Sequence, residues 1–243
     1  MLKRYCGSFL ALILNNDRIV KALLARIPQT ILRQQMGRDY LSPIQKFALD
    51  GYNKRIFQDL PLNSDSKVIV LGGFLGDSAS EYREIYDASV FVTEPISDFF
   101  AVMERRFKGD NKVHLFNEAS TAESHELEIF VSGEGTGLFE FDGEPKLVKG
   151  RSIIELIDEV GGSVDHLEMN IEGGEYSILS CLIKSSYINR CSSVLVQFHN
   201  FGLEQELERA EIRMNLSKSH NLIYCYEWVW ELWIKKDLIQ SNM

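Results

Sequence analysis

Residues 68–78 read VIVLGGFLGDS, in which four apolar residues run directly into a glycine-rich segment. A short apolar run before glycines is typical of a buried parallel strand. Gly72, Gly73 and Gly76 lack a Cβ, so the backbone can turn sharply and approach a ligand closely. The helical pattern that follows would direct its N-terminal amides at that ligand. The stretch therefore predicts a strand–loop–helix cradle for a small polar molecule, with a purely structural turn as the alternative.

The composition is that of an acidic globular protein. The 243 residues carry a formal net charge of −9, and 45% of them are hydrophobic. An acidic chain without a basic run argues against a nucleic-acid partner. No stretch approaches the roughly 20 apolar residues of a membrane span. The apolar run Phe9–Leu14 is short and has no small-residue cleavage site after it, so we expect a cytoplasmic protein without an integral membrane segment.

Residues 1–62 are predicted to form a helical N-terminal extension, because their apolar residues recur at helical spacing. Ser42-Pro43 marks the start of one of these helices. The extension is expected to act as a helical cap on the main domain. A lid or a dimerisation arm, and hence a homodimer, is the alternative.

Residues 63–243 are predicted to form one α/β domain, because strand and helix patterns alternate from residue 67 onward. We expect a mostly parallel, twisted sheet with helices on both faces. A β-rich insertion interrupts the alternation at about 125–149, where short alternating runs and glycine turns appear. The core strands are predicted at 67–71, 89–93, 112–117, 166–171 and 193–199, with two closing strands within 222–236.

The strand ends carry the candidate binding residues, since ligands of open α/β sheets sit at the carboxyl ends of the strands. Glu94-Pro95 follows the second strand, and Glu94 lies 22 residues after Gly72. That spacing is close to the roughly 20-residue offset at which an acid binds ribose hydroxyls. Glu94 could instead only stabilise a helix N-terminus. The later strand ends add Asn117, Glu118, Asn170, Glu172, His199 and Asn200.

Two of these positions have open alternatives. Asn117 either donates to an adenine or turns the chain. His199 stands at a strand end that faces the expected cleft, where it is either a general base or a structural histidine. No phosphate-binding loop, nucleophile elbow or local metal motif occurs in the sequence, so no metal is expected.

Six segments together carry a family resemblance: VIVLGGFLGDSA (68–79), VFVTEP (90–95), VHLFNEAS (113–120), LEMNIEGGEYSIL (167–179), LVQFHNFG (195–202) and YEWVWELW (226–233). With the β-rich insertion, they resemble the FkbM family of S-adenosylmethionine-dependent methyltransferases over roughly residues 67–235. The resemblance implies a Rossmann-like class I methyltransferase fold whose central sheet ends in an antiparallel strand.

The resemblance also implies a cofactor site for S-adenosyl-L-methionine. The glycine loop would line its methionine part, Glu94 would hold the ribose hydroxyls, and Asn117 would lie near the adenine. The residues implied for the cofactor are Gly72, Gly73, Phe74, Gly76, Asp77, Glu94, Pro95, Asn117, Glu118 and Asn170. The chain departs from the family at Val70 and Asn170, where many members carry an acid.

The sequence therefore predicts O-methylation of a sugar hydroxyl in polysaccharide or glycolipid biosynthesis, with a small molecule or a glycan as substrate. His199 is predicted to be the base, with Glu172 and Asn170 binding or orienting the hydroxyl. Asn200, Trp228 and Trp230 are predicted to contact the substrate. The alternatives are a catalytically degenerate domain that binds a cofactor or glycan, and a nicotinamide-dependent oxidoreductase.

Overall fold

The computed structural model describes residues 41–58, 60–132, 135–137 and 144–240. The chain divides into two compact units, Met1–Ile56 and Phe57–Met243, so the division falls slightly before the predicted boundary at 62–63. The described part of the first unit contains α4 (Pro43–Leu49) and α5 (Tyr52–Arg55). The predicted helix start at Ser42-Pro43 is confirmed, because proline at the first helical position is already set in helical geometry. The helical pattern predicted for residues 1–40 lies outside the described residues.

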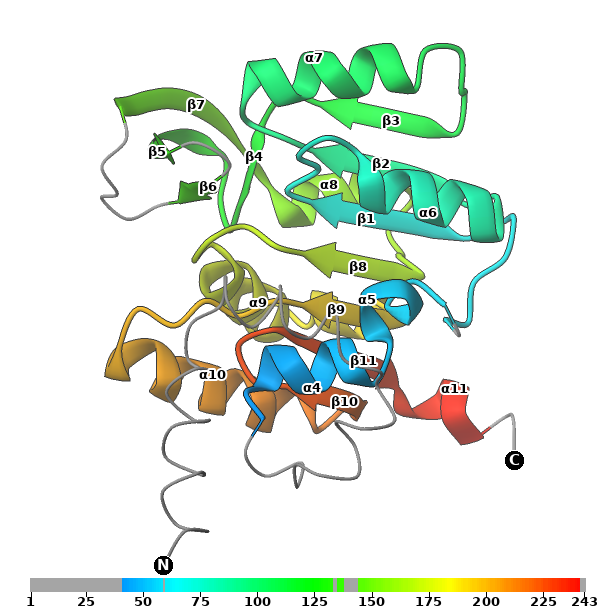
Figure 1. Ribbon diagram of the computed structural model, residues 1–243, viewed down its shortest axis with the longest axis vertical. Helices are drawn as coiled ribbons and strands as arrows, with labels where there is room; N and C mark the ends of the chain where they lie inside the picture. Colours follow the sequence, from blue (N-terminus) through cyan, green and yellow to red (C-terminus); the bar gives the residue numbers. More distant parts are fainter. Residues whose placement is uncertain (1–40, 59, 133–134, 138–143, 241–243) are drawn as a thin grey trace, which may run out of the picture. The chain divides into compact units, whose positions relative to one another are not determined.

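A seven-stranded sheet organises the second unit, with the order β10-β11-β9-β8-β1-β2-β3 (Figure 1). The central strands are parallel, whereas β11 runs antiparallel to β9 and to β10. The predicted Rossmann-like class I methyltransferase fold, mostly parallel with an antiparallel strand, is therefore confirmed. The strands are β1 (Lys67–Leu71), β2 (Ser89–Thr93), β3 (Val113–Phe116), β8 (His166–Met169), β9 (Ser193–Val196), β10 (His220–Tyr226) and β11 (Trp230–Lys235).

Helices cover both faces of this sheet, as predicted, and Figure 1 shows α6 in front of it and α8 behind. Ile69, Leu71 and Met169 belong to one buried apolar cluster with residues of α8, α9 and α10. No helix in the described part of the chain is both long and apolar enough to cross a membrane. The helices are α6 (Asp77–Tyr86), α7 (Ser97–Arg106), α8 (Ile153–Glu159), α9 (Glu175–Lys184), α10 (Leu203–Leu216), α11 (Lys236–Gln240) and a 3₁₀ turn at Tyr187–Arg190.

The predicted β-rich insertion forms a second, smaller sheet in the order β4-β7-β5-β6. Its strands are β4 (Ala119–Thr121), β5 (His125–Ser132), β6 (Gly135–Gly137) and β7 (Glu144–Ser152). The sheet is wider than predicted, because β4 precedes the expected insertion and pairs in parallel with the end of β7. Three residues are too few to show strand alternation, so β4 left no signal in the sequence. Residues 138–141, where the sequence also predicts a short strand of the insertion, lie outside the described residues.

In α10, the helical spacing of Leu203, Leu207, Ala210 and Met214 within residues 203–220 predicts an apolar stripe, but this stripe is not the face that packs on the core. Leu203 and Leu207 are 70% and 65% exposed, whereas Arg209 and Ile212 are buried. Arg209 can be buried because its Nε donates to Glu231 Oε1 at 2.8 Å, so its charge is paired. This ion pair holds the Arg209 side chain on the buried face of the helix. The helix ends at Leu216 and does not continue to residue 220.

Candidate functional site

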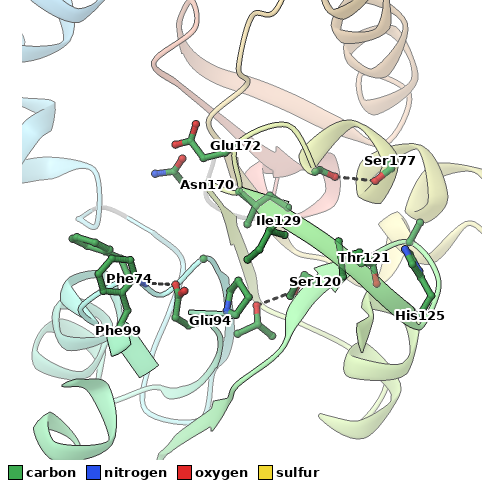
Figure 2. Close-up of a pocket in the computed structure, with 18 of the residues that line it drawn as sticks. Phe74, Glu94, Phe99, Ser120, Thr121, His125, Ile129, Asn170, Glu172 and Ser177 are labelled. Atoms are coloured by element: carbon green, nitrogen blue, oxygen red, sulfur yellow. Dashed lines mark hydrogen bonds between the residues drawn. The ribbon is translucent and has the colours of Figure 1, made fainter. Parts of the chain in front are cut away.

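A cavity of about 560 Å³ lies at the carboxyl ends of β1, β2 and β8 (Figure 2). One part of its wall comes from the large sheet, and the other comes from β4, β5 and the start of α9. This is the edge at which parallel strands of an open α/β sheet present their ligands. The cavity brings together six of the residues singled out from the sequence, namely Gly72, Phe74, Glu94, Pro95, Asn170 and Glu172.

The glycine loop has two different roles within this edge. Gly72 lines the cavity with φ of +84°, and a Cβ there would lie 2.4 Å from the Asn170 carbonyl oxygen. Gly73 and Gly76 do not line the cavity. A Cβ on Gly73 would meet Val92 Cγ1 at 2.2 Å, and a Cβ on Gly76 would meet the Phe107 ring at 2.6 Å. These two glycines therefore allow the loop to pack against β2 and the end of α7, while Gly72 keeps the β1 and β8 ends close.

Glu94 is the buried carboxylate of the cavity, with 5% of its surface exposed. Its Oε2 accepts the Phe74 N–H and its Oε1 accepts the Ile96 N–H, both at 2.8 Å. Burial raises the pKa of the Glu94 carboxyl, and the two amide hydrogen bonds oppose that rise. Each carboxylate oxygen accepts one amide and keeps a further lone pair. Glu94 can thus still accept hydrogen bonds from a ligand inside the cavity.

Two aromatic rings stand beside Glu94. The rings of Phe74 and Phe99 meet edge to face, with 4.6 Å between their centroids (Figure 2). Phe74 has a φ of +47°, which a bulky side chain rarely adopts. The hydrogen bond from its N–H to Glu94 holds this conformation. In the sequence, Phe99 recurs at helical spacing with Phe100, Met103 and Phe107, which indicates only a shared helix face. That pattern does not predict that Phe99 lines the cavity.

The second sheet supplies a wall that the sequence did not predict to be part of the site. Ser120 and Thr121 of β4 and Leu127 and Ile129 of β5 line the cavity. The hydroxyl oxygens of Thr93 and Ser120 lie 2.8 Å apart and join the two sheets (Figure 2). Leu127 and Ile129 alternate with glutamates in the sequence, which indicates that one face of β5 is covered. The alternation does not predict that this face lines a cavity.

Asn170 and Glu172 line the cavity after β8, and His199 stands behind Glu172. His199 Nε2 lies 3.2 Å from Glu172 Oε2, and His199 Nδ1 lies 3.1 Å from Glu175 Oε1. Glu175 is fully buried and also accepts the His199 and Gly173 backbone N–H groups, each at 2.8 Å. Glu175 therefore fixes the imidazole from behind, and the imidazole contacts the glutamate that faces the cavity.

The two glutamates set the charge of His199. Burial favours the neutral imidazole, but the hydrogen bonds that the ring donates to Glu172 and Glu175 outweigh it and raise the pKa of His199 to about 9. Near neutral pH the ring is a cation with both nitrogens engaged, so in this arrangement it has no lone pair with which to accept a proton. Glu172 is the group of this cluster that lines the cavity, and the assignment of His199 as the base stays a prediction from the sequence.

The pKa of His199 gives a testable dependence of stability on pH. A pKa raised from 6.5 to about 9 stabilises the folded state fully below pH 6.5, and the contribution is lost as the pH rises through about 9. The shift corresponds to roughly 3 kcal/mol in the free energy of unfolding. We expect His199→Gln to be less stable than the wild type at low pH, and the difference to shrink above the raised pKa. Urea denaturation of both proteins on either side of that pKa measures this, and a difference that does not vary with pH would contradict it.

Besides Gly73 and Gly76, three further residues predicted for the cofactor do not line the cavity. Asp77 pairs with Arg106 Nη1 at 2.5 Å and is largely exposed. Asn117 donates from its Nδ2 to the Glu94 carbonyl oxygen at 2.8 Å, so it braces the loop that carries Glu94. Glu118 forms an ion pair with Arg151. Their polar groups are engaged by other parts of the protein.

The residues predicted to contact the substrate also lie outside the cavity lining. Asn200 Oδ1 accepts the Gly202 N–H at 2.9 Å, at the start of α10. The Trp228 ring lies 4.5 Å from the Arg209 guanidinium and packs against the core. Trp230 begins β11 and pairs with Tyr226. The aromatic C-terminal segment thus contributes to the sheet and its packing.

Val70, where many FkbM proteins carry an acid, is fully buried in β1. Its partner in the neighbouring strand is Glu168. The Glu168 carboxylate accepts hydrogen bonds from Ser78 Oγ at 2.7 Å and from the Tyr82 hydroxyl at 2.5 Å. Glu168 does not line the cavity, so its carboxylate ties β8 to α6 and does not replace the missing acid by direct contact with a ligand.

No protein-family model matches the sequence, and no curated protein matches it. Among solved structures, the chain is similar to a Methanococcus jannaschii fibrillarin described as a pre-rRNA processing protein (12% identity, 74% of this chain and 70% of that one, TM-score 0.47). It is also similar to an rRNA methylase from Streptococcus thermophilus (8% identity, 80% of this chain and 96% of that one, TM-score 0.45). A third similarity is to Aeropyrum pernix fibrillarin in complex with natively bound S-adenosyl-L-methionine (9% identity, 73% of this chain and 69% of that one, TM-score 0.44). All three TM-scores are below 0.5, so the fold assignment depends on the strand order itself.

Proposed function

We propose that this protein is an S-adenosylmethionine-dependent O-methyltransferase of the FkbM type, acting on a sugar hydroxyl in polysaccharide or glycolipid biosynthesis. The observation that carries the proposal is one cavity that joins Gly72, the buried carboxylate of Glu94 and the cavity-facing carboxylate of Glu172. A cytoplasmic location and a homodimer stay predictions from the sequence.

The cavity fits S-adenosyl-L-methionine by its donor and acceptor set. Glu94 keeps lone pairs that suit two ribose hydroxyls, and the Phe74 and Phe99 rings offer an apolar surface to a planar base. Gly72 leaves the backbone open where the methionine part would lie. When bound, the cofactor supplies an electrophilic methyl group on a sulfonium.

The protein must hold the acceptor hydroxyl and remove its proton. Asn170 and Glu172 both line the cavity and can hydrogen-bond a hydroxyl. We assign proton removal to the carboxylate of Glu172, with the His199 cation holding it in place at 3.2 Å. Orientation of the reacting groups can supply about 7–11 kcal/mol, and a general base adds about 10²–10⁴-fold.

Two other functions would use the same fold. A degenerate domain that binds a cofactor or glycan without turnover is motivated by Val70 and Asn170, where many FkbM proteins carry an acid. A nicotinamide-dependent oxidoreductase is disfavoured because residues 72–76 do not match the G-x-G-x-x-G spacing.

Calorimetric titration of the full chain with S-adenosyl-L-methionine and with NAD separates these functions. We expect S-adenosyl-L-methionine to bind with one site per chain and NAD to give no heat of binding. Binding of NAD alone would favour the oxidoreductase. Binding of neither would favour a degenerate domain that binds only a glycan, and would overturn the proposal.

A further inference from the structure

The charged residues that line the cavity are of one sign. Glu94, Glu123 and Glu172 line it, and no lysine or arginine occurs among its lining residues in the described chain. Arg151 of β7 pairs with Glu118 and Glu159 and lies over the Phe116 ring, 4.5 Å from its centroid. An anionic ligand would therefore meet carboxylates without a compensating cation, which is strongly unfavourable.

Helix N-termini are a second source of anion binding, and the one at this cavity lies beside the buried carboxylate of Glu175. Gly174 lines the cavity at the start of α9. The preceding Gly173 N–H donates to Glu175 Oε2 at 2.8 Å, within the same chain. The α9 N-terminus thus carries its own carboxylate, and a phosphate would have to compete with a fully buried group.

The neutral polar groups of the wall mainly offer lone pairs. Ser177 Oγ donates to the Gly174 carbonyl oxygen at 3.0 Å, and Thr121 Oγ1 donates to the Glu123 carbonyl at 2.9 Å. His125 Nδ1 lies 2.6 Å from the same Glu123 carbonyl oxygen, so this ring nitrogen donates within the chain. Asn170 and one hydroxyl of the Thr93–Ser120 pair can still donate. With the carboxylates, the wall nevertheless has more acceptors than donors, so its ligand must bring several donors.

Apolar side chains lie beside these acceptors. Leu127 and Ile129 of β5 line the cavity, and Figure 2 shows Ile129 between Glu94 and Thr121. A ligand for this wall combines several hydroxyl donors with a face of C–H groups, which is the chemistry of an uncharged sugar ring.

We infer that the second sheet forms the acceptor subsite, and that it takes an uncharged sugar or glycoside and rejects a phosphorylated sugar or a sugar nucleotide. The inference rests on the proposed methyl transfer and names its acceptor class. The hydroxyl to be methylated faces Glu172, while the remaining hydroxyls donate to the wall of β4 and the Ser177 region.

Methyl transfer from labelled S-adenosyl-L-methionine tests the inference with free monosaccharides, their methyl glycosides and the phosphates of the same sugars. We expect transfer to at least one uncharged sugar, and a kcat/KM at least about tenfold lower for its phosphate. A preference for the phosphate, or no transfer to any uncharged sugar by a preparation that binds S-adenosyl-L-methionine, would overturn the inference. A preparation that does not bind the cofactor would instead overturn the proposed function.

A charge-reversal variant sharpens the test. Glu123 is exposed in part and lines the cavity, so Glu123→Lys places a cation at the wall without burying it. We expect this variant to lower the ratio of kcat/KM for the uncharged sugar to kcat/KM for its phosphate by at least about tenfold. Glu126→Lys, an exposed neighbour that does not line the cavity, is the matched control and should keep the wild-type ratio. An equal change in both variants would contradict a role for the wall.

Discussion

Replacing Glu172 by glutamine is expected to lower kcat for methyl transfer by about 10²–10⁴-fold, because the amide cannot take the proton of the acceptor hydroxyl. Glutamine has nearly the same size as glutamate, and it meets the same backbone φ of +49° at position 172. Affinity for S-adenosyl-L-methionine should stay near the wild-type value, because Glu94 and the glycine loop are intact. Initial rates with labelled cofactor and calorimetry of cofactor binding measure the two effects separately.

The neighbours of Glu172 provide the controls. His199→Gln removes the cation at 3.2 Å but leaves the carboxylate in the cavity, so it should lower kcat less than Glu172→Gln does. Glu175→Gln acts through His199 and should shift the pH dependence of the rate, since one of the two carboxylates that raise the pKa of the imidazole is gone. If His199→Gln abolished turnover while Glu172→Gln retained it, His199 would be the base after all.

Replacing Glu94 by glutamine is expected to weaken binding of S-adenosyl-L-methionine by about 10²–10⁴-fold. Two hydrogen bonds to a charged group, each worth about 1.5–3 kcal/mol, would be lost or weakened. The new amide would also turn an NH₂ toward the Phe74 or the Ile96 N–H, each of which now donates to the carboxylate at 2.8 Å. The glycine loop and the start of α7 should therefore loosen together, and calorimetry with thermal unfolding records both changes.

Glu118→Gln is the matched control for Glu94→Gln. Glu118 is also an acid after a strand end, but it pairs with Arg151 and does not line the cavity. Its cofactor affinity should remain at the wild-type value. Equal losses in the two variants, or unchanged binding in Glu94→Gln with a folded protein, would remove Glu94 from the cofactor site.

The sequence predicted the structure correctly wherever a local residue pattern was compatible with one backbone conformation only. The apolar run before Gly72 is a buried strand, and the acid after the second strand reaches the same edge because both strands are parallel. It was not sufficient for Gly73 and Gly76, because a glycine that contacts a ligand and one that accommodates Val92 or Phe107 look the same in a sequence. The sequence also predicts the wrong face of α10 to be buried. Arg209 on the opposite face is buried because it pairs with Glu231 of β11, a contact that the local pattern does not show.

By itself, then, the sequence determined the parallel sheet, the glycine loop and the positions of Gly72, Glu94, Asn170 and Glu172 at its ligand edge. These depend on backbone geometry and side-chain periodicity, which act over a few residues. Only the tertiary structure decided that β4 and β5 close the cavity, and that His199 lies between Glu172 and Glu175 as a cation. Those features arise where segments far apart in the chain are brought into contact, and the burial and charge created there set the chemistry of each group.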